Sequence, residues 1–514
     1  MQYVANPRVS FAIVGNSTSI GPEDQRTLIV GQIVDGATAV AGTLGTDLPR
    51  TDAEINELLG ATSHAAYIAR AYRSVNQRTN VDVLPLADAA GSTAATSSIA
   101  FTGTATANGS LFVTVVSAEN HTYQVDVSTG DTATAIVTNL MAVIAADHWM
   151  PFTSAQTTGT ITFTAVNKGL HANDWLLAVK GGVPGISYTI TGWANGATNP
   201  ALTTLFDPIG VVRYQTVIWP ASYTLSKVQQ FLDARKNVEN SVMDGMAISY
   251  VNQPFSTIKA TALALNSSEV VLFNNEPTNT PAWKGPHVPE APEAITAKIA
   301  AAFDLRVEPN AAISSVIATN AALDQYGGPH THSLPLFNTP LLGSGMPLKG
   351  SGYTDDEQVE LRDSGVSVIG ANREWNAVIT STTVTTWLND VAGNSDDTWK
   401  YAEWRRTHGA IREYFQRNCQ KRFRQCRLTA GTAVVGYDIV DENAIRGYMQ
   451  QLYVELTQLC LTVAGIAARN KFLDNLSVTL VPAQRLVKIN ATKVPMVSQL
   501  GEIDGTVEYT FTTN

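Results

Sequence analysis

Hydrophobic and polar residues alternate at both ends of the chain. Val9, Phe11 and Ile13 alternate with polar or small residues near the N-terminus. Near the C-terminus the alternating hydrophobic residues are Val507, Tyr509 and Phe511. A period of two indicates half-buried β-strands. Glycines separate both strands from the neighbouring sequence, so we expect two strand arms, residues 1–20 and 501–514.

Such arms have two possible partners. They can add to the sheet edges of neighbouring copies, or they can pair within their own subunit. The alternation leaves both possibilities open. Two strand patterns, residues 478–481 and 484–493, come just before the C-terminal arm. We predict that these strands accept the arms, through Val478, Leu480, Leu486, Val487 and Ile489.

Strand and helix patterns alternate in residues 21–93 and again in residues 201–326. In the first stretch, a short buried strand at 27–33 and an Ala-rich helix at 62–76 lead to a strand at 81–85. Alternation with short connections favours a mostly parallel sheet covered by helices. We therefore predict one α/β domain made of two separate pieces.

The intervening residues, 94–200, are rich in Thr, Ala, Gly and Ser and almost free of charge, and they predict an inserted, mainly β domain. A Pro/Gly-rich passage, residues 327–353, is typical of an extended linker. Residues 354–500 then predict an α+β C-terminal domain with long helices at about 399–426 and 441–463. The expected fold class is an α/β core with these two additions and with terminal strand arms exchanged between subunits.

Charge and cysteine content narrow the possible environments. The 514-residue chain carries a net charge of −10, which opposes binding to nucleic acid and to anionic membranes. We find no signal-peptide pattern, and the apolar run at 459–468 is too short to cross a bilayer. Three cysteines suit a reducing compartment. We expect a soluble protein made in the cytoplasm.

Basic residues outnumber acidic ones strongly between residues 400 and 427, against the acidic balance of the chain. Such a helix requires an anionic partner. It can be a solvated or intrasubunit face, a contact for an acidic protein surface, or a nucleic-acid site. The last is disfavoured because no aromatic stacking platform or DNA-binding motif accompanies it.

No set of residues with catalytic or metal-binding spacing is evident. Cys419 and Cys426 are too far apart for the usual zinc pattern, and His330 and His332 form only a weak pair in a loop. No strand is followed by a phosphate-binding glycine motif. We predict no catalytic residues, no metal and no cofactor.

The order of segments resembles the contractile tail sheath proteins of Mu-like myophages. The resemblance lies in RTLIVGQ (26–32) with the ELLGATSHAAYIARAYR helices (57–73), in LRDSGVSVIG (361–370), and in DIVDENAIRGYM (438–449) with PAQRLVKIN (482–490). These patterns are individually weak, and their order carries the resemblance. The alternative reading is a surface glycan-binding or adhesin-type protein in which the inserted β domain is the recognition unit, and an enzyme is a third reading.

The resemblance implies a structural subunit that polymerises helically around an inner tail tube. Contraction of the sheath would drive the tube through the host envelope while exchanged strands keep subunits linked. The implied partners are many copies of the same chain, the tail tube protein, and baseplate and tail terminator proteins, without nucleic acid or membrane insertion. The implied location is the virion tail, assembled in the host cytoplasm.

The resemblance also implies a C-terminal helix that faces the tube. It points to the helix at 441–463, whereas charge points to the helix at 400–427, and both remain open. The candidate tube-facing basic residues are Arg405, Arg406, Arg412, Arg417, Lys421, Arg424 and Arg446.

Overall fold

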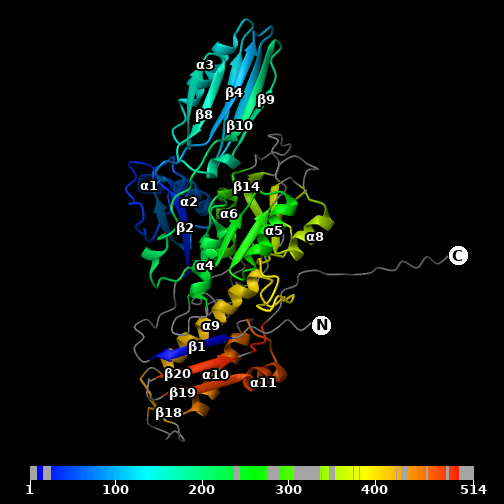
Figure 1. Ribbon diagram of the computed structural model, residues 1–514. Helices are drawn as coiled ribbons and strands as arrows, with labels where there is room; N and C mark the ends of the chain where they lie inside the picture. The colour runs from blue at the N-terminus through cyan, green and yellow to red at the C-terminus, as the bar shows by residue number, and fades with distance from the viewer. Residues whose placement is uncertain are drawn as a thin grey trace, which may run out of the picture.

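The computed structural model has three parts stacked along one axis (Figure 1). The inserted β domain is at one end, an α/β layer is in the middle, and a smaller C-terminal part is at the other end. The structure describes residues 9–14, 25–236, 243–274, 290–305, 336–345, 353–458 and 461–496, except 118, 337–338, 374–375, 381, 424, 430–437, 482–485 and 492.

An eight-stranded sheet forms the middle part. Six of its strands are parallel, and β16 and β14 extend one edge in antiparallel pairing. In spatial order the strands are β14 (Pro340–Gly345), β16 (Asn376–Ile379), β15 (Val366–Ala371), β13 (Val270–Asn274), β12 (Met246–Tyr250), β11 (Thr216–Ile218), β2 (Arg26–Gln32) and β3 (Asn80–Leu86).

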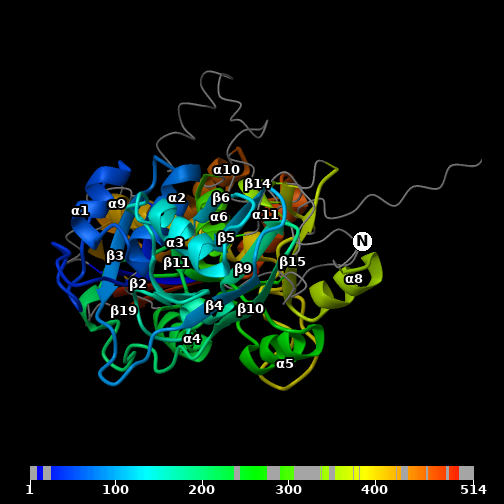
Figure 2. The same cartoon turned by 90° about the horizontal axis from the view of Figure 1, so that it is seen from above.

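Helices cover both faces of this sheet. Figure 2 shows α2 (His64–Val75) and α4 (Leu225–Arg235) on opposite sides of β2 and β11. Consecutive residues of β2 serve the two faces, since Ile29 joins the core under α2 while Leu28 and Val30 join the core under α4. A strand buried on both faces must be apolar at nearly every position, as the sequence TLIV is. The remaining helices are α1 (Asp52–Leu59), α5 (Phe255–Leu265), α6 (Pro292–Leu305) and α8 (Asp355–Asp363).

The insertion between β3 and β11 contains two antiparallel sheets and the α-helix α3 (Ala133–Ile144). One sheet has the order β10-β4-β8-β7 and the other β6-β5-β9. The strands are β4 (Thr96–Gly103), β5 (Gly109–Val116), β6 (Asn120–Val127), β7 (Phe152–Thr157), β8 (Thr160–Ala165), β9 (Leu176–Gly181) and β10 (Ile186–Ala194), with the short helices η1 (His171–Asp174) and η2 (Asp207–Ile209).

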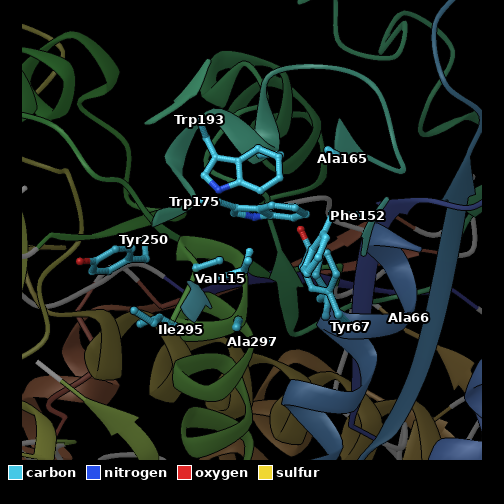
Figure 3. Packing of buried hydrophobic residues seen from close by; sticks show 14 of the residues in the cluster. Ala66, Tyr67, Val115, Phe152, Ala165, Trp175, Trp193, Tyr250, Ile295 and Ala297 are labelled. Carbon is cyan, nitrogen blue, oxygen red and sulfur yellow. The ribbon is translucent and has the colours of Figure 1, made fainter. Parts of the chain in front are cut away.

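The insertion shares one hydrophobic core with the α/β layer. Trp175 and Trp193 of the insertion lie close to Tyr67 of α2, with Phe152 beside them (Figure 3). All four side chains are almost fully buried. The insertion is therefore packed onto the layer and is not merely tethered to it.

The C-terminal part has a separate hydrophobic core. It contains α9 (Ala402–Phe423), α10 (Glu442–Gln458), α11 (Ile466–Asp474) and the hairpin of β19 (Leu476–Val481) and β20 (Leu486–Ala491). The N-terminal strand β1 (Val9–Val14) pairs with this hairpin, and β17 (Arg427–Leu428) pairs with β18 (Ile439–Val440).

Two predicted boundaries differ from the structure. Residues 340–345 lie in the predicted linker but form the edge strand β14. Residues 355–379 lie in the predicted C-terminal domain, yet β15 pairs in parallel with β13 and so belongs to the α/β sheet. The composition of residues 327–379 does not reveal that β14 and β15 join the α/β sheet, because their partner strands, β16 and β13 respectively, are not adjacent to them in the sequence.

Candidate assembly surface

The C-terminal sheet has three strands in the order β1-β20-β19. The register pairs Phe11 with Ile489 and Ile13 with Val487, and on the other side of β20 it pairs Val478 with Ile489. β20 is therefore fully flanked, and the predicted acceptor strands do form one hairpin. Residues of β19 and β20 alternate between buried and exposed, which is the signature of a sheet with one covered face.

Helices cover that face. Val478, Val487 and Ile489 are at most 5% exposed and share a core with Phe415 of α9 and Met449 of α10. The other face carries the exposed Ser477, Thr479 and Lys488. Hydrophobic burial on one side thus fixes the register of the hairpin, because a slip of one residue would expose the whole apolar set.

The strand β19 is an edge. No further strand pairs with it among the described residues. Its six residues, LSVTLV, include no charge and no proline. Native proteins commonly protect sheet edges with lysine, proline or a bulge, and β19 has none of these. It is therefore suited to accept another strand.

Arg446 holds this edge strand in place. Its guanidinium lies 2.5 Å from the carbonyl oxygen of Leu476 and 3.0 Å from that of Leu473, and it donates to both. These carbonyls belong to the end of α11 and the start of β19. Arg446 is half-buried and positions the strand, and its assignment as a tube-facing residue stays a prediction.

The first half of α9 is buried within the chain. Arg405 donates hydrogen bonds of 3.0 Å to both Asp244 and Glu269, and Arg412 donates one of 2.7 Å to Asp244. Arg406 donates to Asp304 over 3.0 Å. All three arginines are at most 9% exposed, so their predicted role as tube-facing residues is wrong.

The carboxylates lie at the amino-terminal edge of the parallel strands. Asp244 and Glu269 lie just before β12 and β13, respectively. Asp304 accepts hydrogen bonds from the hydroxyls of Thr27 and Thr216, at the starts of β2 and β11. The basic helix therefore docks the C-terminal part onto the α/β layer. Among the alternatives left open, an intrasubunit face is the arrangement observed for this half of the helix.

The electrostatics of the contact follow from burial and pairing. Burial by itself raises the pKa of the Asp244 carboxyl, but Arg405 and Arg412 outweigh it and hold that pKa well below its usual range. Burial also raises the pKa of Glu269, but the charges of Arg405 and Lys236 outweigh burial and lower it. Both carboxyls are therefore ionised at neutral pH, and the contact consists of charged pairs removed from water.

The second half of α9 leaves some positive charge accessible. The Arg417 side chain is 17% exposed and lies 3.9 Å from Glu413, whereas Lys421 and Arg422 are exposed. Arg424 lies outside the described residues. On α10 an exposed stripe contains Asn443, Gly447, Gln451 and Val454, and it carries no charge.

The two terminal arms have different outcomes. In this single chain, β1 pairs with β20 of its own subunit, which is one of the two possibilities that the alternation left open. The other arm, with Val507, Tyr509 and Phe511, lies outside the described residues, as do His330 and His332. In the described ranges, no helix is long and apolar enough to cross a membrane, and no group of three or more potential ligands is arranged for a metal ion.

Comparison with known proteins confirms the resemblance. No protein-family model matches the chain. The chain is 31% identical over 179 residues to the Mu-like prophage FluMu tail sheath protein of Haemophilus influenzae. The match covers 34% of this chain and 36% of that protein, so it spans about a third of the relative's length. A crystal structure of a sheath tail protein from Listeria innocua aligns over 93% of this chain and 95% of that one, with 9% identity and a TM-score of 0.44, a likeness too distant to carry an argument.

Proposed function

We propose that this chain is the structural subunit of a contractile phage tail sheath. Its copies would polymerise helically around an inner tail tube and contract to drive the tube through the host envelope. Its partners would then be the tail tube, baseplate and tail terminator proteins of a virion tail. The match to a prophage tail sheath protein supports this role, and the unprotected edge of β19 is the structural feature that supports assembly through strands.

Strand exchange would need no new type of contact. The strand β1 is joined to β2 only through residues 15–24. If β1 of one copy occupied the place beside β20 of the next, the same backbone hydrogen bonds would form between subunits, as in domain swapping. The C-terminal arm would add to β19, whose outer edge has backbone groups to share. Each backbone hydrogen bond contributes only about 0.5–1.5 kcal/mol, but a strand repeated on every copy makes a continuous mesh.

The tube-facing surface would combine the end of α9 with the exposed stripe of α10. Because the first half of α9 is buried, its arginines are not accessible to another protein. Lys421 and Arg422 at the end of α9, together with the exposed stripe of α10, remain available. We assign tube contact to this region. Reversing the charge of Lys421 and Arg422 should weaken binding to the tube protein, whereas the same reversal at Lys227 in α4 should not.

Cysteine pairing distinguishes exchange from pairing within one subunit. Ser10 and Asn490 are directly opposite in the β1–β20 register, and opposed residues of an antiparallel pair are close enough for a disulfide. Oxidised S10C/N490C protein should give covalent multimers on a non-reducing gel if β1 is exchanged. It should give a monomer with an internal disulfide if β1 stays in its own subunit. The S10C single variant is the matched control.

Assembly itself is tested by electron microscopy of the purified protein. We expect long hollow polymers from the intact chain, and folded monomers after deletion of residues 1–19 or 501–514. A proline scan over Ser477 to Leu480 then probes the edge. Alternate backbone amides of β19 point toward β20 and away from it, so some prolines should unfold the hairpin while others should abolish polymers only. Discrete particles from the intact chain under all assembly conditions would contradict the proposal.

A further inference from the structure

The junction between the inserted domain and the α/β layer gathers an unusual set of titratable side chains, all of them buried except the partly buried Asp174. His64 and Tyr67 come from α2, His171 and Asp174 from η1, and Glu293 from the first turn of α6. His64 and Glu293 are 0% exposed, and His171 is 1% exposed. Buried groups of this kind are normally paired, because an unpaired one costs free energy.

Several of these groups lack a partner. Both carboxyl oxygens of Glu293, Nε2 of His64, Nδ1 of His171 and the hydroxyl of Tyr67 are buried without a hydrogen-bond partner in the part of the chain that the structure describes. The His64 and His171 rings stack with centroids 4.7 Å apart, and His64 lies 5.2 Å from the Tyr67 ring. Groups from both domains thus meet in one unsatisfied cluster.

The position of the cluster in the fold explains why polar groups gather there. In the sheet, β3 pairs with one edge of β2, and the later strand β11 pairs with the other edge. The direction in which successive strands are added therefore reverses between β2 and β11. Open α/β sheets carry their polar sites at the carboxyl ends of strands beside such a reversal. Here the inserted domain covers that position, since Asn167 after β8 accepts from the backbone of His64 and donates to the carbonyl of Ile33.

We propose that this junction is a pH-sensitive joint, which holds the inserted domain against the α/β layer while Glu293 is uncharged and loosens when Glu293 ionises. A neutral carboxyl at this buried position needs no counterion, whereas a carboxylate would be desolvated, and the described part of the chain places no cation beside it. Among the described residues, the titratable groups that act on Glu293 are Tyr67, Tyr223 and Asp174, and none of these three supplies positive charge.

The directions of the pKa shifts agree with this geometry. Burial, and then the charge of Asp174, raises the pKa of Glu293 to about 8. Glu293 therefore contributes fully to the free energy of docking at pH values below the ordinary carboxyl pKa. This contribution is lost as pH rises toward 8. Burial raises the pKa of Asp174 to about 6, so its own contribution is lost as pH rises through about 6.

The two histidines affect docking at low pH. Burial lowers the pKa of His171 to about 4, and burial with the neighbouring His171 lowers that of His64. Nδ1 of His64 accepts from the backbone N–H of Gln32, a bond that protonation of this nitrogen would remove. Their contribution is complete above about pH 6.5 and is lost as pH falls. The interval from about pH 6.5 to 8 therefore isolates Glu293.

Hydrogen exchange of the full chain tests the joint. After correction for intrinsic rates, peptides covering residues 61–67 and 168–175 should exchange about tenfold faster per pH unit between about pH 6.5 and 7.5, the slope for release of one proton. In E293Q this response should disappear. The matched control is E403Q, which removes another buried carboxyl of raised pKa, in α9 and outside the joint, and should leave the response intact.

A second variant keeps the test decisive if E293Q does not fold. Removing the nearby negative charge in D174N should lower the pKa of Glu293 and so reduce the acceleration between pH 6.5 and 7.5. A flat profile in the wild-type protein would overturn the proposal. So would an unchanged response in E293Q, or in D174N where E293Q is unfolded.

Discussion

The carboxylate of Asp244 lies 2.7 Å from the guanidinium of Arg412, although the two residues are 168 positions apart. Asp244 also accepts from Arg405, so one buried carboxylate pairs with two arginines of α9. This contact joins the α/β layer to the C-terminal part, and the buried start of α9 continues directly into the C-terminal core at Ile411 and Phe415. The two parts are therefore connected by one continuous helix fixed at both ends.

Removing the Asp244 carboxylate should destabilise this connection strongly. In D244N two buried arginines lose their shared counterion, and breaking a buried pair in this way costs about 3–5 kcal/mol. Chemical denaturation of the variant and the wild-type protein would measure the loss. The matched control is D363N, because Asp363 pairs with Lys400 at the surface with its side chain 57% exposed, and such pairs contribute about 0–1 kcal/mol.

Acid should weaken the same contact. Arg405 and Arg412 lower the folded-state pKa of Asp244 against the effect of burial, so its contribution is complete above the ordinary carboxyl pKa, near about 4, and is lost as pH falls below that value. The denaturation midpoint of the wild-type protein should fall below about pH 4, and that of D244N should fall less. Equal acid sensitivity of the two proteins would contradict this assignment.

The C-terminal core should depend on Phe472. This side chain is 0% exposed, and its ring lies 4.8 Å from Tyr453 and 5.7 Å from Phe415. F472A should lower the stability of this part by about 3–5 kcal/mol because it leaves a cavity between the rings of Tyr453 and Phe415. L263A, at a position 56% exposed, should change stability by less than about 0.5 kcal/mol. Thermal unfolding would give both values.

Arg446 should matter for local order at the strand edge. Replacing it with lysine removes the planar fork that reaches two carbonyl oxygens at once, so R446K should increase hydrogen exchange in residues 473–478. R422K, at an exposed position near the end of α9, should leave the exchange of that segment unchanged. Slow exchange retained in R446K would show that the hairpin needs no such clamp.

The cysteines should differ in reactivity. Burial raises the pKa of the Cys419 thiol, which is 0% exposed. Cys426 is partly exposed, and its pKa is raised less strongly, by burial and then by Asp438. Because the thiolate is the reactive form, alkylation of the native protein followed by peptide mass analysis should find Cys426 modified well before Cys419. Unfolding in denaturant should remove the difference.

The sequence by itself determined the local elements. Periodicity of two predicted the hairpin of β19 and β20. The start of α8 is also a local feature, because Thr354 and Glu357, three residues apart, form both hydrogen bonds of a capping box there. The order of short motifs also indicated similarity to tail sheath proteins, which the match over 179 residues confirms. Such signals are local, because hydrogen bonding and hydrophobic spacing act within a few residues.

Only the tertiary structure decided where the charges lie. The arginines of α9 are typical of a surface helix, and nothing near them in the chain indicates that Asp244, Glu269 and Asp304 neutralise them. In the same way, the burial of Glu293 at the junction depends on how the insertion packs on the α/β layer. Charge pairing and desolvation depend on distance in space, which the linear order of residues does not contain.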